Sequence, residues 1–484
     1  MVEAPTRTKL KKLYQALRER PLWPDDPACV DLLAMGVLSA TNPVERMATC
    51  IEFAGLETAQ LFSGHRGTGK STLLRALKRR LEADPAYKVV LCDMEDFLPM
   101  TDTVEVVDFL LAAAGALSEA LDTPELLGED ASRESYWSRF AHWVLNTNIE
   151  AKESGIGAKA GAKASARATD DTGAEAGAEA GLEVKLNLKT DPSFRRRIRE
   201  HMKLHVGAFR KEVHGFMQEC LLALRERHGD DTQLVVIYDS IEHLRGLTTN
   251  AEDVANSVER LFRGHADALR VPNLHMVFTV PPWLRLQYPV TADRFDGYYQ
   301  VPCVKVRTRR NDLATPLEAE QDGLNALWKV ARQRGADDWL TWLLGDREAF
   351  DKLALASGGY LRDLLRMLRA LLLEANVTGV PVPEARRDLV VQELRAGYLG
   401  FTNEEAAWLR QVERTGAVDF ADGTMHHRVA VFLDTHVLLA YRNGEDWYGV
   451  HPVIAADVVR RAKDWDAVQD KKKLAADEGE AREG

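Results

Sequence analysis

The sequence has few cysteines, no long apolar run and no excess of positive charge. Its five cysteines stand singly, without a Cys-x-x-Cys pair or a cysteine–histidine cluster, so we predict neither a disulfide framework nor a zinc site. No apolar run approaches about 18 residues, so we expect no membrane span. The basic residues 1–12 lack the apolar core of a secretory signal, and we therefore expect a protein of the reducing cytoplasm.

Charge and composition narrow the classes of partner. The formal net charge is −11, so a surface that binds nucleic acid would have to be a local patch. The 484 residues, 45% of them hydrophobic and 28% charged, suit a globular protein of about two to four domains. The sequence shows no arrangement typical of a nuclease, protease, deaminase or NAD-cleaving enzyme. If the biological output is destructive, we expect another polypeptide to supply it.

One complete phosphate-binding loop is present. Residues 64–71 read Gly-His-Arg-Gly-Thr-Gly-Lys-Ser, with an apolar strand before them at 59–63 and an amphipathic helix after them. Glycines let the backbone wrap a polyphosphate, Lys70 reaches the β- and γ-phosphates, and the Ser71 hydroxyl coordinates Mg²⁺. The sequence therefore predicts a site for ATP, or another nucleoside triphosphate, with Mg²⁺. The predicted nucleotide-binding residues are Gly64, His65, Arg66, Gly67, Thr68, Gly69, Lys70, Ser71 and Thr72.

A second strand in the sequence ends in a carboxylate. Residues 233–239 form a continuous apolar run that ends at Asp239, as in a central parallel strand covered on both faces. Ligands of open α/β sheets bind at the carboxyl ends of the strands. We therefore predict that Asp239, with Ser71, holds the Mg²⁺ shell.

The group that orients the attacking water has more than one candidate. Many ATPases of this type place a glutamate directly after the strand-ending aspartate, but here that position is Ser240. Glu242 is the predicted base, and Glu95 or Asp96, after the strand at 88–93, is the alternative; Glu242 could equally be a surface carboxylate. The departure at position 240 predicts slow, switch-like hydrolysis.

Further side chains fit roles around a triphosphate, each with a structural alternative. Thr279, near the end of the strand at 274–280, is either a γ-phosphate sensor or a core threonine, and Arg294 is either an arginine finger or a surface residue. Arg362 follows a glycine pair in a first helical turn, where it is either a lid arginine that gives bidentate phosphate contacts or an ordinary arginine of the helix face. The predicted catalytic residues are Lys70, Asp239, Glu242 and Arg362.

Two further elements are predicted from local patterns. Asp191-Pro192 is predicted to cap one long helix, because apolar residues from Phe194 to Cys220 recur mostly at three- and four-residue steps. The run 195–197, at the start of this helix, is a solvated face or a nucleic-acid contact. Residues 298–306 are predicted to form a fifth strand.

The segments 62–72, 239–242 and 357–362 together resemble the AAA+/STAND-type P-loop ATPases of bacteria, over roughly residues 50–370. This resemblance implies an α/β P-loop NTPase sheet of order 5-1-4-3-2, a helical lid and nucleotide-controlled oligomerisation. It also implies a signalling role, including one in prokaryotic antiviral defence. The helix from Thr402 and the hairpin at 436–450 resemble a winged helix, although the acidic hairpin tip at 445–446 suits a protein partner at least as well as DNA.

Three functions follow as alternatives. The first is an ATP-controlled homo-oligomeric switch that acts on a partner protein, the second a DNA-binding initiator- or loader-like ATPase, and the third a scaffold that holds nucleotide without turnover.

The chain begins with a helical lead-in that is interrupted at 21–27. This stretch is either an adenine contact or a packing collar. The predicted domains are a helical lead-in (1–50), an ATPase core (51–310) with a disordered Ala/Gly-rich insertion near 151–190, a helical lid (311–385), a winged-helix-like domain (386–465) and a disordered tail (466–484).

Overall fold

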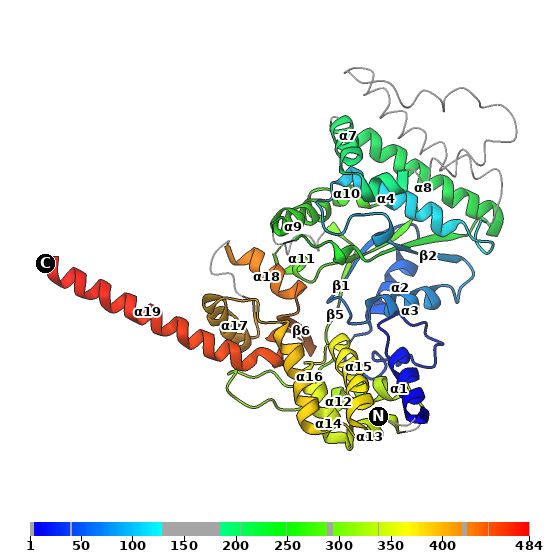
Figure 1. Cartoon of the computed structure of the whole chain (residues 1–484). Coiled ribbons are helices and arrows are strands. Elements are labelled where there is room, and N and C mark those ends of the chain that lie inside the picture. Colours follow the sequence, from blue (N-terminus) through cyan, green and yellow to red (C-terminus); the bar gives the residue numbers. More distant parts are fainter. Residues whose placement is uncertain are drawn as a thin grey trace, which may run out of the picture. The chain divides into compact units, whose positions relative to one another are not determined.

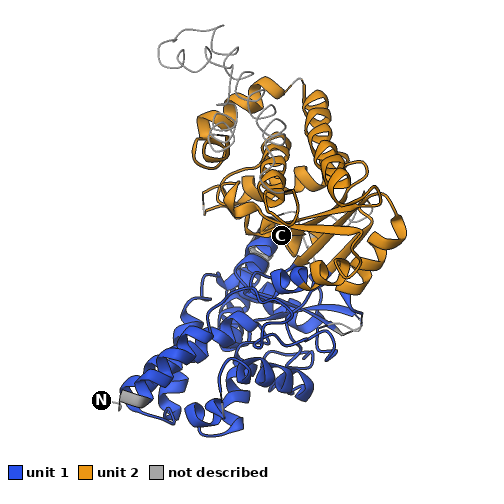
Figure 2. Ribbon diagram, turned by 90° about the vertical axis from the view of Figure 1, so that its right-hand side faces the viewer, with its two compact units in different colours: residues 1–43, 64–75, 300–484 blue, residues 44–63, 76–299 orange. Residues whose placement is uncertain are grey.

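The computed structural model describes residues 4–38, 41–127, 184–203, 205–247, 249–287, 294–336, 338–418, 424–443 and 445–483. The chain divides into two compact units, shown in Figure 2. Unit 1 comprises residues 1–43, 64–75 and 300–484, and unit 2 comprises 44–63 and 76–299. No described helix has the length and apolar character that a membrane span requires.

Unit 2 is built around a sheet of order β2-β3-β4-β1-β5. The neighbours β2 and β3, β3 and β4, and β4 and β1 pair in parallel. Read from the other edge, this order is the predicted 5-1-4-3-2, so the predicted sheet is confirmed. The strands are β1 (Thr58–Gly64), β2 (Tyr87–Asp93), β3 (Gln233–Asp239), β4 (His275–Val280) and β5 (Gly297–Val301). The fifth strand was predicted to reach residue 306, but it ends before Pro302, whose ring nitrogen cannot donate to a ladder.

Apolar strands and apolar helices form the core of unit 2. Every residue of β1 and β4 is buried, as expected for strands covered on both faces. The helix α4 (Val106–Leu121) packs on β2, and Figure 1 shows α4 and α8 side by side. Its Phe109 ring lies 6.2 Å from Tyr238 and 6.0 Å from Phe278. The Tyr238 hydroxyl donates to the Ala113 carbonyl at 3.0 Å, so this core tyrosine is satisfied.

Two predictions for residues 151–228 need correction. Residues 151–183 lie outside the described residues, but 184–190, included in the predicted insertion, are helical with Val184 and Leu188 buried. The helix predicted as one from Asp191 to Cys220 is two, α7 (Pro192–Met202) and α8 (Val206–His228). The break arises because the His205 N–H bonds the Met202 carbonyl three residues back, not four. The predicted cap at Asp191 is confirmed, since it accepts from the Ser193 N–H at 2.8 Å.

The other helices of unit 2 precede or connect the strands. Helix α2 precedes β1, and the short helices α9, α10 and α11 lie between β3 and β5. The α-helices are α2 (Pro43–Ala54), α9 (Ala251–Glu259), α10 (Ala266–Leu269) and α11 (Trp283–Gln287), and α3 (Lys70–Leu81) begins in unit 1 and ends in unit 2.

Unit 1 contains the phosphate loop and a helical bundle that corresponds to the predicted lid. In it α1 packs against α15, and Arg334 donates to the Ala16 and Arg18 carbonyls at 3.3 and 3.4 Å. The N-terminal segment is therefore part of the bundle. The helices are α1 (Ala4–Ala16), α12 (Gln321–Arg332), α13 (Trp339–Leu344), α14 (Arg347–Ala356), α15 (Leu361–Thr378) and α16 (Glu384–Ala396).

The C-terminal part of unit 1 has the winged-helix-like order of two helices, a hairpin and a further helix. These elements are α17 (Asn403–Thr415), α18 (Thr424–Asp434), the antiparallel strands β6 (Leu438–Asn443) and β7 (Glu445–Val450), and α19 (Ala455–Glu483). A buried Glu413 joins α17 to the hairpin by accepting from Arg307 at 2.9 Å, Arg310 at 2.6 Å and the Val450 N–H at 2.7 Å.

The tail beyond residue 465 was predicted to be disordered, but α19 continues to Glu483. The helix starts on buried residues, Val458 and Ala462, and an Arg410–Asp466 ion pair of 2.8 Å adds a contact further along. Once begun, a helix propagates through good helix formers, and the Lys-, Ala- and Glu-rich tail supplies them. Composition without large apolar residues therefore did not distinguish a solvated helix from disorder.

Candidate functional site

The phosphate loop connects β1 to α3, as predicted. β1 ends at Gly64 and α3 begins at Lys70. Gly67 and Gly69 have φ angles of +89° and +96°, which favour glycine. A Cβ on Gly67 would lie 2.5 Å from Arg362 Nε, so this position has no room for a side chain. The loop therefore has left-handed glycine positions of the kind that let a backbone curve round a polyphosphate.

The Thr68 and Lys70 side chains bond the loop's own backbone. Lys70 is 3% exposed, and its ammonium donates to the Gly64 and His65 carbonyls at 2.9 Å each. The Thr68 hydroxyl donates to the His65 carbonyl at 2.9 Å. The Thr72 hydroxyl accepts from the Leu22 N–H at 3.1 Å, which places the lead-in segment beside the start of α3.

His65 joins the phosphate loop to the C-terminal part of unit 1. Its Nδ1 lies 3.1 Å from the Leu433 carbonyl, and its Nε2 lies 3.0 Å from the Ala440 N–H. A carbonyl only accepts and an amide N–H only donates, so His65 is the neutral Nδ1–H tautomer. Burial lowers the pKa of His65 to about 4, in agreement with a neutral ring.

Tyr360 makes a second connection. Its hydroxyl donates to the Arg66 carbonyl and lies 3.1 Å from His436 Nε2, which must then be the protonated nitrogen. The two rings stack, with centroids 4.5 Å apart, and the His65 and His436 rings are 5.5 Å apart. Burial, with His65 as a smaller cause, lowers the pKa of His436 well below its usual value. Two neutral histidines and a tyrosine thus couple the loop to the region after α18.

Arg362 lies in the first turn of α15, where the sequence placed it. The chain reaches this turn through Gly359, whose Cβ would lie 1.7 Å from the Val304 carbonyl oxygen, so only glycine fits. Asp363 is fully buried and accepts from Tyr398 and from His451 Nε2, the latter at 3.2 Å. These contacts hold the first turn of α15, and Arg362 packs on Gly67 of the phosphate loop.

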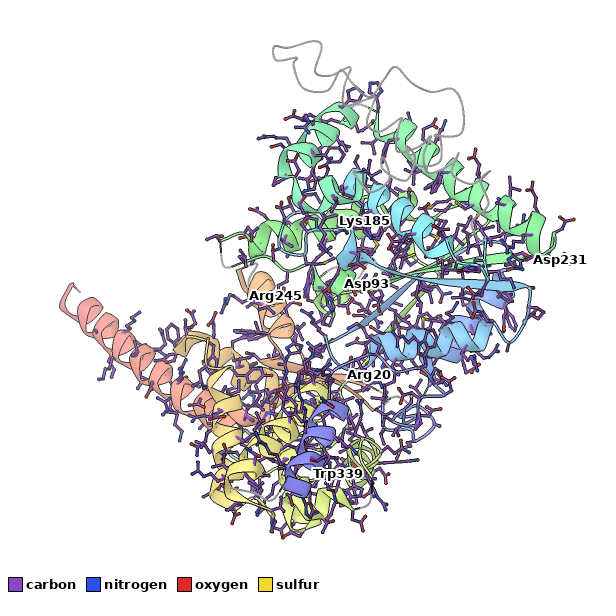
Figure 3. The ribbon with its side chains drawn as sticks, turned by 45° about the vertical axis from the view of Figure 1, so that its right-hand side comes forward. Arg20, Asp93, Lys185, Asp231, Arg245 and Trp339 are labelled. Atoms are coloured by element: carbon purple, nitrogen blue, oxygen red, sulfur yellow. The ribbon has the colours of Figure 1, made fainter. Side chains whose placement is uncertain are left out.

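In unit 2, two carboxylates end neighbouring strands. Asp93 of β2 and Asp239 of β3 are register partners, and Figure 3 labels Asp93 at the end of β2. The Ser240 N–H donates to Asp239 Oδ1 at 2.8 Å, and Ser240 has a left-handed φ of 68°. The chain therefore bends sharply after β3. Any further side chain at the carboxyl end of this strand must come from a residue beyond Ser240.

Glu242, the predicted base, forms a chain with a histidine and a second carboxylate. Its side chain is 4% exposed and lies 3.6 Å from His243 Nε2. The other ring nitrogen of His243 is in hydrogen-bond contact with Glu95, the alternative base. The structure therefore brings both candidates to one histidine. No contact described links Asp96 to His243.

Thr279 has a structural role in the same turn. Its hydroxyl accepts from the Ile241 N–H at 3.0 Å and lies 3.4 Å from the Tyr238 carbonyl, and the residue is fully buried. Arg294 is exposed. Arg195, read from sequence as part of a solvated face, is instead 3% exposed and forms a 2.6 Å ion pair with Asp102, so it stabilises unit 2.

The residues fit a magnesium–nucleotide complex better than a protein-only metal site. Among the described residues, no group of three or more His, Cys, Asp or Glu side chains is arranged to hold a metal ion. Mg²⁺ at a phosphate loop is bound by one or two protein oxygens together with phosphates. Ser71 belongs to unit 1 and Asp239 to unit 2, and their joint role as metal ligands stays a prediction.

Sequence reasoning missed three contacts near the candidate site. It placed His65 in the loop but not on the hairpin, and it gave no role to Tyr360, His436 or His243. No local pattern marks His65, Tyr360 or His436, because their partners are far away in the sequence. The glycine pair before Arg362 was the only signal that pointed towards Tyr360.

Comparisons with known proteins give a distant likeness in fold. No protein-family model and no curated protein sequence matches the chain. The ORC2 protein of Aeropyrum pernix (ADPNP–ADP complexes) is 10% identical with a TM-score of 0.39, and the match covers 89% of this chain and 94% of that one. Cdc6p of Pyrobaculum aerophilum is 12% identical with a TM-score of 0.33, and the match covers 90% and 98%. The strand order and the phosphate loop themselves make this chain an α/β protein of the P-loop NTPase fold, with a helical lid and a winged-helix-like C-terminal region.

Proposed function

We propose that this protein is an ATPase of the AAA+ type, in which the helical C-terminal region responds to the nucleotide held by the phosphate loop. The observation that carries the proposal is that three consecutive loop residues each contact a distant part of unit 1. His65 bonds residues 433 and 440, Arg66 accepts from Tyr360, and Gly67 packs on Arg362. A loop that moves when it binds phosphate would move these contacts.

The chain supplies the groups that ATP binding requires. The loop N–H groups and Lys70 would hold the phosphates, and Ser71 and Asp239 would hold Mg²⁺, which neutralises charge on the phosphates when bound. Thr72 and its neighbours would complete the nucleotide site. Arg362 would contact phosphate from the lid.

Hydrolysis is proposed to be slow. Because Ser240 follows Asp239, we propose Glu242 as the water-orienting carboxylate, with Glu95 or Asp96 as the alternative; Glu242 and Glu95 share His243. A carboxylate in the turn that follows a strand is less directly placed for the attacking water than one at the end of the strand itself. Slow turnover suits a switch, in which the ATP-bound state must persist long enough to act.

The proposed partners are a second copy of the chain and a protein effector. Arg294 is exposed and would serve as the arginine finger of a homo-oligomer. Prokaryotic defence is the setting that the STAND-type resemblance implies. All five cysteines are free, which supports a reducing compartment, and we propose the cytoplasm.

A DNA-binding initiator- or loader-like ATPase is the second candidate. The helix–helix–hairpin order of α17, α18, β6 and β7 favours it, since winged helices bind DNA in many proteins. The hairpin charges favour it less, because Arg442 is paired with Asp446 at 2.6 Å.

One set of measurements tests both candidates. Calorimetric titration with MgATP and mass measurement with and without MgATP, on wild type and Lys70→Ala, are expected to show binding and a change of mass in wild type alone. Absence of ATP binding to wild type would reject the ATPase. Salt-dependent binding of duplex DNA by the full chain would support the second candidate, and no DNA affinity at low salt would eliminate it.

A further inference from the structure

Glu19 is an acidic side chain that the structure places on the lid arginine, Arg362. Its Oε2 lies 2.8 Å from Arg362 Nε, and its Oε1 lies 2.8 Å from Arg366 Nε. The two arginines are one helical turn apart on α15, so a single carboxylate bridges them. All three side chains belong to unit 1, as does the loop residue Gly67 on which Arg362 packs.

The carboxylate is a close but poorly aligned partner for Arg362. The Arg362 Nε atom is buried, and among the described residues it makes no aligned hydrogen bond, although it lies within ion-pair distance of Glu19. A buried guanidinium N–H gains from an acceptor on its axis. Phosphate oxygens provide such acceptors, and an arginine fork binds them in pairs.

The chain around Glu19 is attached to the phosphate-loop helix as well. The Leu22 N–H donates to the Thr72 hydroxyl at 3.1 Å, and Arg75 donates to the Pro21 carbonyl at 2.7 Å. The Arg75 guanidinium also lies 4.9 Å from the centre of the Trp23 ring. Residues 19–23 therefore connect two elements that are proposed to contact the nucleotide: the start of α3 and the first turn of α15.

We propose that Glu19 is a specificity-determining residue of the nucleotide site, because its carboxylate and the terminal phosphate of ATP are alternative partners of Arg362. The inference rests on the proposed function, namely that the loop binds ATP. The loop N–H groups would enclose the inner phosphates and Lys70 would reach the β- and γ-phosphates, whereas Arg362 comes from the lid and would meet the terminal phosphate. ADP lacks that phosphate, so only ATP competes with Glu19.

This competition has two consequences. Glu19 lowers the affinity for ATP relative to ADP, since part of the ATP binding free energy separates the ion pair. Separation of that pair also releases residues 19–23 from α15, so the lead-in segment senses the terminal phosphate. The Glu19–Arg362 ion pair that ATP separates is partly exposed and contributes up to about 1 kcal/mol, which corresponds to about a five-fold change in the affinity for ATP.

The test is a double-mutant cycle read by equilibrium binding. MgATP and MgADP are titrated into wild type, Glu19→Gln, Arg362→Gln and the double variant, all as full chains. We expect Glu19→Gln to tighten MgATP about five-fold and to leave MgADP unchanged. In the Arg362→Gln background the Glu19 substitution is expected to change neither affinity. Glu384→Gln, which removes an exposed glutamate of unit 1 that is paired with Lys352, is the matched control and should change neither.

A second readout follows the lead-in segment. Amide hydrogen exchange in residues 17–24 is expected to speed up with MgATP but not with MgADP in wild type, and to be fast without nucleotide in Glu19→Gln. Equal shifts for both nucleotides, weaker ATP binding in Glu19→Gln, or an effect that persists without Arg362 would each overturn this inference alone. If wild type binds neither nucleotide, the proposed function fails and this inference fails with it.

Discussion

Replacement of His65 by glutamine should remove a pH dependence of stability that the buried ring imposes. His65 donates to the Leu433 carbonyl and accepts from the Ala440 N–H, so only the neutral ring satisfies both partners. Burial lowers its pKa from 6.5 to about 4, and the charge of Lys70 acts in the same direction. A protonated His65 would also direct an N–H at the Ala440 N–H.

The sign and size of the effect follow from these two pKa values. Above pH 6.5 the ring is neutral in the folded and the unfolded chain, and it adds no pH dependence. Between pH 6.5 and pH 4 the unfolded chain binds a proton that the folded protein excludes, so stability falls as the pH falls. At 1.36 kcal/mol per pH unit, the difference from 6.5 to about 4 amounts to about 3 kcal/mol.

Urea unfolding followed by circular dichroism at several pH values measures this effect. The difference in unfolding free energy between wild type and His65→Gln should change by about 1.4 kcal/mol per pH unit between pH 6 and pH 4.5. Burial also lowers the pKa values of His275 and His436, but these rings are present in both proteins and cancel. His201→Gln, at an exposed histidine of α7, should leave the slope unchanged. Parallel curves for wild type and His65→Gln would refute the reasoning.

Three other substitutions test separate contacts. Glu413→Ala leaves Arg307 and Arg310 buried without their carboxylate and should lower the unfolding free energy by about 3–5 kcal/mol. Glu404→Ala, on the exposed face of the same helix, should change the unfolding free energy little. Equal urea midpoints for the two variants would contradict this. Tyr360→Phe removes the donor to the Arg66 carbonyl and should lower the unfolding free energy by about 0.5–1.5 kcal/mol, seen as a lower thermal midpoint, and an unchanged midpoint would show that the contact contributes nothing. Glu242→Gln should keep MgATP binding and slow steady-state phosphate release by about 100-fold or more if Glu242 is the base, and unchanged turnover would transfer that role to Glu95.

Local sequence patterns predicted the elements whose structure depends on local forces. The apolar runs at 59–63, 88–93 and 233–239 became β1, β2 and β3 of one sheet, and the glycine pair before Arg362 became the entry to α15. The capping box at Thr402 and Glu405 also formed where the sequence suggested a helix start. The prediction of a disordered C-terminal tail was wrong, because a charged, Ala-rich composition is common to solvated helices and to disordered chains.

The sequence by itself determined that the chain has a phosphate loop between a strand and a helix, because glycine spacing and Lys70 are local properties. Only the tertiary structure decided what that loop contacts. His65 meets residues more than 360 positions away, and Glu19 meets Arg362 across a similar separation. Such contacts depend on how packed helices bring remote side chains together, and no periodicity or spacing in the sequence records that arrangement.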